Sequence, residues 1–558
     1  MQNLFGLLEQ SANRYGDKVF CQIREKDNWQ RLSFRQLRDS AEALARALKS
    51  QGFGTGDKIA VISENRPEWG IVFFAVLRID AIVIPLDKLL KKDEIQSILE
   101  KGEPKLLICS AHFLDVLSQI PLKIPILCLD ENPSKFPTLA HGVERGLQSP
   151  ELGQPLSTSE STAIMIFTSG TTGNPKGVML THGNFLSNVE SFFKLFPASF
   201  FKSNFLSILP LNHAFELTGG FLTPLYGGGT ITYQDSLKPT HVLQTMRDTA
   251  TRIMLTVPAF LEMLYRNLLH QVGQSEAKQK KFNFALKLAS LCPAQGFRRW
   301  LFREIHAVFG GDLQYFVSGG APLSGEVQEA FEKLGFTVIQ GYGLTETSPV
   351  VTVNPFHRTK RNSVGRPVPG IEVRIEGEEG EILVKGPNVM KGYYKDPEAT
   401  EAVFKEGYFA TGDIGYVDRD GYIYISGRLK NLIVTSAGKK VFPEEIEEKL
   451  KAVPYVKEGC ILGRKTGLEE EVIAVVIPDQ DKLKQNETPR GEVRGILWEG
   501  IKKMNGTMAD YKRIKDLIVW EGEFPKTTTL KVKRRELEQL IQGQVRSKVV
   551  ASSAEPVT

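Results

Sequence analysis

The sequence predicts an α/β protein. We expect a large N-terminal region of doubly wound, largely parallel sheets with a β-rich subdomain, followed by a small mobile α+β C-terminal domain. Three observations predict this: strand-like apolar runs alternate with helical stretches, each later run ends in a loop of small residues, and the pattern changes beyond about residue 360. The expected parts are residues 1–429, residues 430–541 and a disordered tail at residues 542–558.

The first elements form a βαβ pattern. Residues 32–50 carry apolar side chains at helical spacing, and Gly52 stands where a helix C-cap belongs. The run KIAVI (Lys58–Ile62), a helical stretch containing Trp69–Leu77 and the run AIVIP (Ala81–Pro85) follow in order. Strand, helix and strand in this order predict a parallel, covered sheet.

Later apolar runs fit the same scheme. They are AIMIF before Thr168, NFLSILP before Leu211, RIMLTV before Pro258, YFV before Ser318 and TVIQ before Gly341. In doubly wound sheets, ligands bind at the carboxyl ends of the strands. We therefore expect the chemistry in the loops that follow these runs.

The C-terminal part has a different pattern. The short runs EVRI, EILVKG, YIYISG and NLIVTS are separated by turn residues such as Asp420-Gly421, which predicts the β-rich subdomain. After Lys430, a helix is expected to begin near Pro443, because proline favours the first helical turn and Glu444 and Glu445 follow it.

Composition excludes several classes of protein. Of 558 residues, 41% are hydrophobic and 24% charged, as in ordinary globular proteins, and the net charge of +5 is too small for a dedicated nucleic-acid binder. The five cysteines form no CxxC pair, which argues against a disulfide framework or a cysteine zinc site and predicts a reducing, cytoplasmic location. No signal peptide is expected, because the N-terminus lacks a basic start and an apolar stretch of signal length. No transmembrane helix is expected, because Arg78 and Asp80 interrupt the most apolar segment.

The strongest single motif is TSGTTGNPKG, directly after an apolar strand. It combines hydroxyls, glycines and a cation, namely Thr168, Ser169, Gly170, Thr171, Thr172, Gly173 and Lys176. Backbone N–H groups, hydroxyl donors and an ammonium group suit a polyphosphate, whereas the alternative is a flexible surface turn. The motif is not a Walker A loop, because Gly177 follows the lysine.

With six further motifs, the chain resembles the adenylate-forming superfamily, which includes acyl-CoA synthetases, luciferases and peptide-synthetase adenylation domains. In the order of the family, these motifs are LPLNHAFE (Leu209–Glu216), SGGAPL (Ser318–Leu323), QGYGLTET (Gln340–Thr347), YFATGD (Tyr408–Asp413), SGRLKN (Ser426–Asn431) and PKTTTLK (Pro525–Lys531). The motifs are spread over nearly the whole chain, so chance agreement with the order of the family is negligible.

The resemblance implies an ATP site. The TSGTTGNPKG loop would hold the β- and γ-phosphates, and SGGAPL, with Gly320 and Ala321, would line the adenine pocket together with Tyr342. Gln340, Gly341 and Gly343 would also contact the nucleotide. Thr345 and Glu346 would contact the α-phosphate, and Thr168 and Glu346 would position Mg²⁺. Asp413 would bind the ribose hydroxyls, and Arg428 would pair with ribose or phosphate. Taken alone, these acidic and basic residues would be ordinary surface charges.

The resemblance also implies catalytic residues. His213 would lie beside the acyl carboxylate, with a core histidine as the alternative, and Lys531 would reach the carboxylate and the α-phosphate. The alternative for Lys531 is a plain basic helix face, and its loop departs from the family because Leu530 stands where many members have glycine. Lys430 would be the hinge, and Gly438 would border the pantetheine tunnel of CoA or lie merely in a turn.

A long segment before SGGAPL resembles the long-chain branch of the family. The residues Phe282, Phe284, Leu286 and Leu288, with Lys280, Lys281 and Lys287, would form either a membrane-facing stripe or part of the core. The phenylalanine cluster, comprising Phe192, Phe193, Phe196, Phe200, Phe201 and Phe205, would form an acyl-tunnel entrance or, as we favour, internal packing.

The leading hypothesis is a fatty acid–CoA ligase that uses ATP and Mg²⁺ to form acyl-AMP from a medium- to long-chain fatty acid and then an acyl-CoA thioester. The alternative acceptor is acyl carrier protein. The alternative of another class is a non-catalytic nucleotide- or lipid-binding protein. No nucleic-acid partner is expected, and the location is cytoplasmic or peripheral at the inner face of a membrane.

Overall fold

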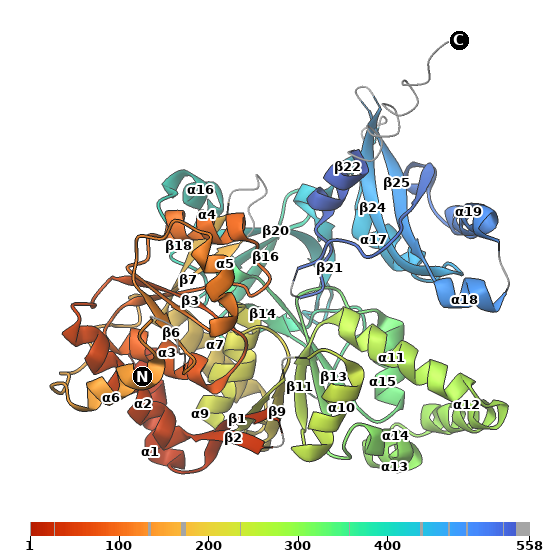
Figure 1. Ribbon diagram of the computed structural model, residues 1–558. Coiled ribbons are helices and arrows are strands. Elements are labelled where there is room, and N and C mark those ends of the chain that lie inside the picture. Colours follow the sequence, from red (N-terminus) through yellow and green to blue (C-terminus); the bar gives the residue numbers. More distant parts are fainter. Residues whose placement is uncertain are drawn as a thin grey trace, which may run out of the picture. The chain divides into compact units, whose positions relative to one another are not determined.

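The computed structural model describes residues 2–26, 28–131, 136–168, 175–234, 236–356, 358–435, 439–466, 469–486, 489–527 and 529–542 (Figure 1). The chain divides into two compact units. The first comprises residues 1–374, 383–411 and 417–423, and the second comprises residues 375–382, 412–416 and 424–558. The predicted domain boundary after residue 429 stays a prediction, and the predicted tail lies, apart from Gln542, outside the described residues.

The predicted doubly wound α/β fold is confirmed, and the larger of its two main sheets has nine strands. In spatial order these are β15 (Arg366–Pro367), β14 (Val350–Val353), β13 (Thr337–Gly343), β12 (Tyr315–Ser318), β11 (Ile253–Thr256), β9 (Asn204–Ser207), β10 (Thr230–Tyr233), β1 (Val19–Glu25) and β2 (Asn28–Ser33). The strands from β13 to β1 pair in parallel, whereas the outer strands β14, β15 and β2 are antiparallel to their neighbours.

The second main sheet has seven strands. Their order is β18 (Gly392–Tyr393), β8 (Lys176–Thr181), β7 (Thr162–Thr168), β4 (Ile82–Pro85), β3 (Lys58–Ile62), β5 (Leu106–Cys109) and β6 (Ile126–Cys128). The strands from β7 to β6 pair in parallel, and β8 and β18 add antiparallel pairs at the edge. Strand β3, helix α3 (Pro67–Arg78) and strand β4 are the predicted βαβ unit.

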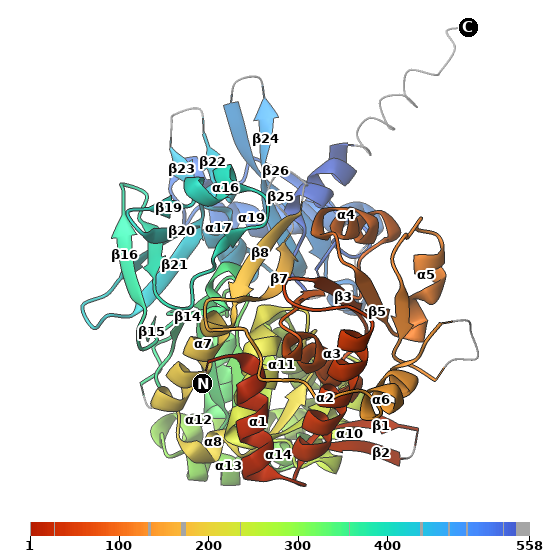
Figure 2. The same cartoon turned by 90° about the vertical axis from the view of Figure 1, so that its left-hand side faces the viewer.

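Helices cover both sheets (Figure 2). The main apolar core joins residues of both sheets to α1 (Leu4–Tyr15), α2 (Phe34–Ser50), α3, α7 (His182–Leu195) and the π-helix η2 (Glu216–Leu222). On its other face, the seven-stranded sheet packs against α4 (Lys92–Gly102) and α5 (Leu114–Ser118). The doubly wound arrangement buries the central parallel strands, such as β3, β5 and β11, on both faces, as parallel sheets require.

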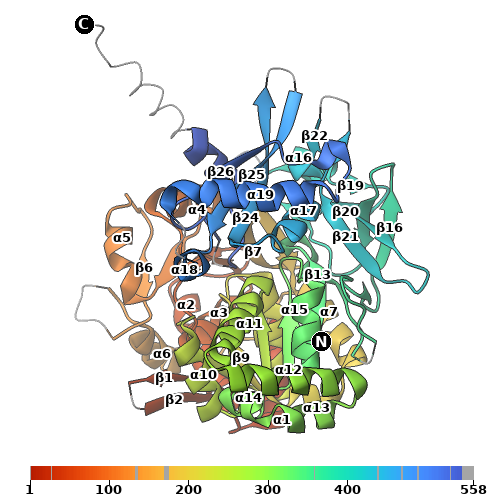
Figure 3. The same cartoon turned by 90° about the vertical axis from the view of Figure 1, so that its right-hand side faces the viewer.

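The remaining helices of the first unit include a group on the other face of the nine-stranded sheet (Figure 3). The helices and turns not yet named are η1 (Ala111–Phe113), α6 (Leu139–Leu147), α8 (Ala198–Phe201), α9 (Thr223–Gly227), α10 (Pro239–Asp248), α11 (Pro258–Gly273), α12 (Glu276–Leu291), α13 (Gln295–Leu301), α14 (Arg303–Val308), α15 (Gly325–Lys333), η3 (Thr345–Thr347) and α16 (Pro397–Ala402). Ring contacts of Phe316 on β12 with Phe309 and Phe331 fix α14 and α15 to this sheet.

The predicted β-rich section forms a five-stranded sheet. It has the order β16 (Glu372–Glu376), β17 (Glu381–Lys385), β20 (Tyr408–Val417) and β19 (Phe404–Lys405), with β21 (Ile423–Arg428) also paired to β20. Of the predicted runs, NLIVTS contributes only the short strand β22 (Ile433–Val434), which pairs with β23 (Lys440–Val441).

The second unit has an α+β core. Its three-stranded sheet has the order β24 (Val456–Thr466), β25 (Glu469–Pro478) and β26 (Asp516–Val519). Its helices and turns are η4 (Leu429–Asn431), α17 (Pro443–Leu450), α18 (Gln480–Gln485), η5 (Arg490–Glu492), α19 (Val493–Asn505) and η6 (Asp510–Lys512). Apolar residues of α17 and α19 pack on one face of the sheet, and Trp520, Phe524 and Leu537 pack on the other. Pro443 occupies the predicted first position of α17.

Local signals explain where the early helices begin and end. The Ser33 side chain accepts a hydrogen bond from the Gln36 backbone, and the Gln36 side chain accepts one from the Ser33 backbone, so a capping box starts α2. At its end, Gly52 adopts a φ of +91°, a conformation that glycine tolerates best. Among the described residues, no helix is long and apolar enough to cross a bilayer.

Candidate active site

The phosphate-loop motif joins two antiparallel strands. Thr168 at the end of β7 lies directly opposite Lys176 at the start of β8. The residues between them that the sequence assigns to phosphate binding, Ser169–Gly173, lie outside the described residues. The two described ends of the motif therefore lie together at the carboxyl end of β7.

Tyr393 links this motif to Glu346. The Lys176 ammonium group lies over the Tyr393 ring, 4.8 Å from its centroid, and the Tyr393 hydroxyl donates a hydrogen bond of 3.1 Å to Glu346 Oε1. Burial and the neighbouring Glu346 carboxylate raise the pKa of Tyr393, so its hydroxyl stays protonated and acts as a donor. The contact brings together a cation of the seven-stranded sheet and a carboxylate that follows β13.

Backbone contacts hold the Glu346 turn. The Met390 N–H donates to the Glu346 carbonyl at 2.8 Å, and Asn188 Nδ2 on α7 donates to the carbonyls of Thr347 and Ser348. Buried hydrogen bonds of this kind fix a loop because breaking one leaves an unpaired polar group. The Glu346 carboxylate is therefore positioned before any ligand binds.

His213 also lies at strand ends. Its Nε2 is 3.3 Å from Asp87 Oδ2, which follows β4. The loop that carries His213 is held by Asn65, whose Nδ2 donates to the Leu209 carbonyl at 2.7 Å and whose Oδ1 accepts from the Leu211 N–H at 3.0 Å. The half-exposed ring of His213 is thus not the buried core histidine of the alternative interpretation.

Three polar residues form a row across the nine-stranded sheet. Thr256, Ser318 and Gln340 are in register on the adjacent strands β11, β12 and β13. All three are buried, and their side-chain oxygens have no hydrogen-bond partner among the described residues. Because buried polar groups are normally paired, this row fits the polar atoms of a bound molecule.

The other predicted nucleotide contacts follow the same strands. Gly320, after β12, has a φ of +81°, which requires glycine, and a Cβ on Gly319 would lie 3.1 Å from Phe215. Gly341, Tyr342 and Gly343 belong to β13 itself, and Tyr342 is buried. Ala321 follows Gly320, and Thr345 begins η3, so the predicted contacts in this part lie in the second half of β13 or in the turns that follow β12 and β13.

Glu216 follows the His213 loop in the chain and is fully buried. It begins η2, and a Cβ on Gly220 would lie only 2.4 Å from Glu216 Oε1, so a larger residue there would force the Glu216 side chain to move. Burial raises the pKa of Glu216 to about 8, so the side chain is largely neutral at pH 7. The Ser207 side chain is the polar neighbour that lowers the pKa of the Glu216 carboxyl, and its effect is smaller than that of burial.

The second unit holds a separate charged cluster. The Arg428 guanidinium forms a bidentate pair with the buried Asp413 carboxylate, with Nη2 and Oδ2 at 3.3 Å. Lys531 is exposed on the surface of the second unit. Surrounding protein atoms nevertheless desolvate its ammonium group, and together with the positive charges of Arg428 and Lys430 they lower its pKa to about 8. The predicted ribose, hinge and catalytic residues are thus neighbours within one unit.

The Lys531 loop contains a backbone conformation that is unusual for leucine. Leu530 has a φ of +59°, which costs a residue with a Cβ about 1–2 kcal/mol. Thr527 holds the turn, because its Oγ1 accepts from the Lys531 N–H at 3.2 Å and its own N–H donates to the Lys531 carbonyl at 2.9 Å. The position where related sequences carry glycine therefore has the conformation that glycine favours. Gly438 lies outside the described residues.

The residues present fit a magnesium nucleotide. No cluster of three or more His, Cys, Asp or Glu side chains that could hold a metal exists in the described part of the chain. Mg²⁺ is commonly bound by one or two carboxylates together with substrate phosphates. One carboxylate at Glu346, beside the Lys176 cation, matches this pattern better than a metal cage made by protein alone.

Sequence reasoning missed four of these residues. Asp87 directly follows a parallel strand and could have been found by the same rule that located the other loops. Thr256 ends a predicted strand, but its lack of a partner is visible only in the structure. Tyr393 lies in the run KGYYKDP, which carries no signal for a site. Asn65 follows β3 and gives no sign of its long-range role.

The site and the fold together define an α/β enzyme class that acts on a nucleotide at the carboxyl ends of its strands. Family comparison agrees. The profile described as AMP-binding enzyme matches residues 8–394, and the profile described as AMP-binding enzyme C-terminal domain matches residues 430–548. The chain belongs to the AMP-binding enzyme family, within the adenylate-forming acyl-CoA ligase superfamily.

Individual relatives differ in the acid they use. The long-chain-fatty-acid–CoA ligase FadD15 of Mycobacterium bovis is 30% identical over 459 residues, covering 78% of this chain and 76% of that protein. The indoleacetate–CoA ligase of Aromatoleum aromaticum is 28% identical over 556 residues, covering 96% and 97%. The crystal structure of ATP-bound MatB from Rhodopseudomonas palustris matches with a TM-score of 0.77 and 26% identity, covering 97% of this chain and 99% of MatB.

Proposed function

We propose that the protein is a fatty acid–CoA ligase that activates a medium- to long-chain fatty acid with ATP and transfers the acyl group to CoA. The observation that carries the proposal is the contact of Lys176, Tyr393 and Glu346, which places a cation and a carboxylate beside the phosphate-loop motif. The family supplies the reaction class, and the FadD15 relative supports the fatty acid.

In the first half-reaction, an oxygen of the fatty acid carboxylate forms a bond to the α-phosphorus of ATP. The bond from that phosphorus to the bridging oxygen breaks, and pyrophosphate leaves. Both reactants are anions, so cations must offset the charge as they approach. Lys176 serves the β- and γ-phosphates, and Glu346 with Thr168 would hold Mg²⁺, which would supply positive charge to offset that of the phosphates.

Lys531 is the proposed cation for the transition state. With a pKa of about 8, it keeps most of its positive charge at pH 7. His213, oriented by Asp87, faces the acyl carboxylate, and the pair of Asp413 with Arg428 receives the ribose and phosphate of the nucleotide.

In the second half-reaction, the sulfur of CoA forms a bond to the acyl carbon, the bond from this carbon to the AMP oxygen breaks, and the thiol proton passes to solvent. We propose that the C-terminal domain turns about Lys430 between the two steps, and that Gly438 borders the path of the pantetheine arm. The match of the C-terminal family profile from residue 430 supports a domain boundary there.

The test measures AMP and pyrophosphate released from ATP with a panel of fatty acids, with indoleacetate and without acid, each in the presence and absence of CoA. We expect thioester only with a fatty acid and CoA together. A preference for indoleacetate would overturn the fatty acid, and a requirement for acyl carrier protein would overturn the acceptor. Failure to exchange labelled pyrophosphate into ATP with every acid would leave a non-catalytic binding protein.

Roles within the site are tested with paired variants. Glu346→Gln removes the proposed Mg²⁺ ligand, and exposed Glu326→Gln is its control. We expect the first to weaken pyrophosphate exchange and to raise the Mg²⁺ concentration needed for half-maximal rate. An unchanged Mg²⁺ dependence would reject the role of Glu346.

A further inference from the structure

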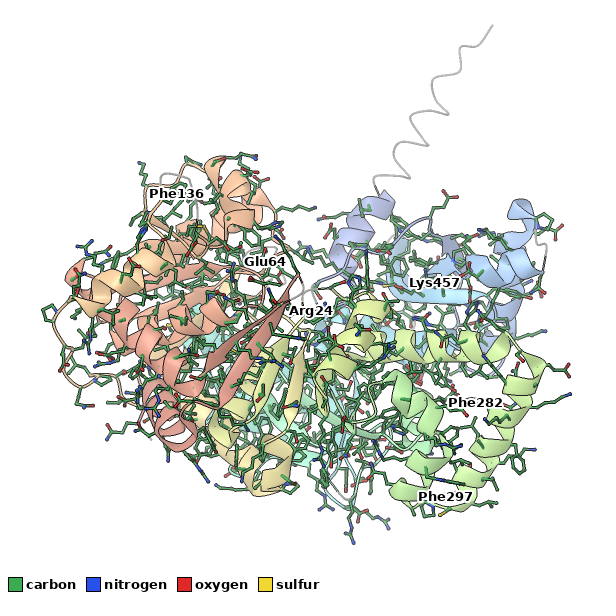
Figure 4. The ribbon with its side chains drawn as sticks, turned by 60° about the horizontal axis from the view of Figure 1, so that its bottom comes forward. Arg24, Glu64, Phe136, Phe282, Phe297 and Lys457 are labelled. Atoms are coloured by element: carbon green, nitrogen blue, oxygen red, sulfur yellow. The ribbon has the colours of Figure 1, made fainter. Side chains whose placement is uncertain are left out.

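Helix α12 is apolar on two opposite faces. Phe282, Ala285 and Ala289 are buried and pack toward the body of the first unit. The ring of Phe282, a residue labelled in Figure 4, has its centroid 5.9 Å from that of Phe302. Phe284 and Leu291, by contrast, are 64% and 81% exposed. They are seven residues apart, which is two helical turns, so they lie on one face. The sequence left open whether Phe282 and Phe284 belong to the core or face a membrane. Phe282 belongs to the core, and Phe284 does not.

Lysines flank the exposed apolar side chains. Lys280 lies one turn before Phe284 and Lys287 one turn after it, and both are exposed. We call Lys280, Phe284, Lys287 and Leu291 the α12 stripe. A packed helix needs one apolar face. The second face, with large apolar side chains between ammonium groups, has the composition of a helix that lies in a membrane interface.

The charge of the surrounding segment is concentrated. Residues 276–308 contain seven Lys and Arg against two Glu, so their net charge of +5 equals that of the whole 558-residue chain. Two of the arginines, Arg298 and Arg299, donate to backbone carbonyls, but they retain their charge. Within the same segment, Trp300 is 62% exposed, and the Arg303 guanidinium lies 5.8 Å from its ring.

We propose that the α12 stripe docks onto the surface of an anionic lipid bilayer. Phe284 and Leu291 insert between the acyl chains, while the lysines extend their charged ends to the headgroups. The positive charge of residues 276–308 attracts the surface, and the attraction falls off within a Debye length. The inference deepens the proposed function, because long-chain fatty acids accumulate in bilayers. Only this reason for docking rests on the proposed function.

The test is co-sedimentation of the full chain with vesicles of phosphatidylcholine, with and without phosphatidylglycerol, in the absence of acid, ATP and CoA. We expect binding to the anionic vesicles that weakens at high salt. The double variant Phe284→Ser/Leu291→Ser should lower the partition coefficient by at least about tenfold, because each side chain loses apolar burial. Lys280→Glu/Lys287→Glu should weaken binding to anionic vesicles alone.

The matched control is Leu147→Ser/Leu156→Ser, because these leucines are 70% and 76% exposed elsewhere in the chain. Its binding should equal that of the wild type. Binding of the apolar α12 variant at the wild-type level, or equal binding to neutral vesicles, would overturn the proposal. Loss of a concentration-dependent dimer in that variant, without vesicle binding by the wild type, would assign the stripe to a second copy instead.

Activity separates this inference from the proposed function. The apolar α12 variant should retain its rate with a water-soluble medium-chain acid while losing rate with a long-chain acid supplied in anionic vesicles. Vesicle binding without any ligase activity would overturn the proposed function and leave the docking surface. Ligase activity without vesicle binding would do the reverse.

Discussion

The two charged clusters of the protein are held in different ways. In the first unit, Lys176, Tyr393 and Glu346 extend from strands and turns that buried hydrogen bonds fix in place. In the second unit, Arg428 pairs with Asp413, and Lys531 lies where desolvation and the positive charge of Arg428 lower its pKa. Hydrogen bonds therefore position the groups of the first cluster, whereas burial and nearby charges set the protonation of Lys531 in the second. Removing a hydroxyl should disturb the first, and changing a charge or the pH should disturb the second.

The largest effect is expected for Lys531→Ala. Loss of a cation that acts only in the transition state should slow pyrophosphate exchange by about 100-fold or more, while thioester formation from supplied acyl-AMP continues. In the wild type, exchange should fall as the pH rises through about 8, because Lys531 then loses its proton.

The control is Lys533→Ala, since Lys533 pairs with Glu536 at 3.5 Å and is not assigned to the site. Exchange by the Lys533 variant should match the wild type. Equal loss in both variants would reduce Lys531 to part of a general basic surface.

Glu216→Gln tests a buried acid of the first unit that has no cation beside it. The folded pKa of about 8 lies above the ordinary 4.5, so the folded state keeps a proton that the unfolded chain releases. The wild-type free energy of unfolding should therefore fall as pH rises between these values, by up to about 1.4 kcal/mol per pH unit. The variant should lack this slope in denaturant titrations.

The exposed Glu326→Gln variant should keep the wild-type slope. The falling limb of exchange near pH 8 should persist in Glu216→Gln, because we assign it to Lys531. Its disappearance would show that Glu216, and not the lysine, governs the activity profile.

Tyr393→Phe removes the hydroxyl that binds Glu346 and keeps the ring that contacts Lys176. Loss of this one hydrogen bond should lower the exchange rate by about tenfold, since a partner is left unpaired. The control is Tyr394→Phe, at the adjacent position. The Tyr394 hydroxyl accepts a hydrogen bond of 2.8 Å from Lys58 rather than contacting Glu346. Equal exchange rates for the two variants would show that the Tyr393 hydroxyl has no role in the site.

The smallest effect is expected at Leu530, where the second unit stores backbone strain. Leu530→Gly removes the cost of a Cβ at positive φ, whereas Leu530→Ala retains it. We expect the glycine variant to be more stable than the alanine variant by about 1 kcal/mol in chemical unfolding. Equal stabilities would show that this position carries no strain.

Much of the site could be predicted because it follows strands. Thr168 ends a buried apolar strand, and His213, Gly320 and Glu346 lie in the turns after such strands. Ligands of doubly wound sheets bind at these carboxyl ends. Asp87, Asn65 and Tyr393 could not be paired with their partners from sequence. Each contact joins residues far apart in the chain, as Tyr393 and Glu346 do across 47 positions.

The sequence by itself determined the α/β class, the βαβ unit, the capped helix α2 and the motifs of the family, because these depend on local periodicity, turn chemistry and residue type. The tertiary structure decided which apolar side chains are buried. Phe282 and Phe284 share one helix and one composition, yet only Phe282 faces the body of its unit. The structure also decided that Glu216 is neutral and that Lys531 has a lowered pKa, because burial and neighbouring charges are set by distant segments.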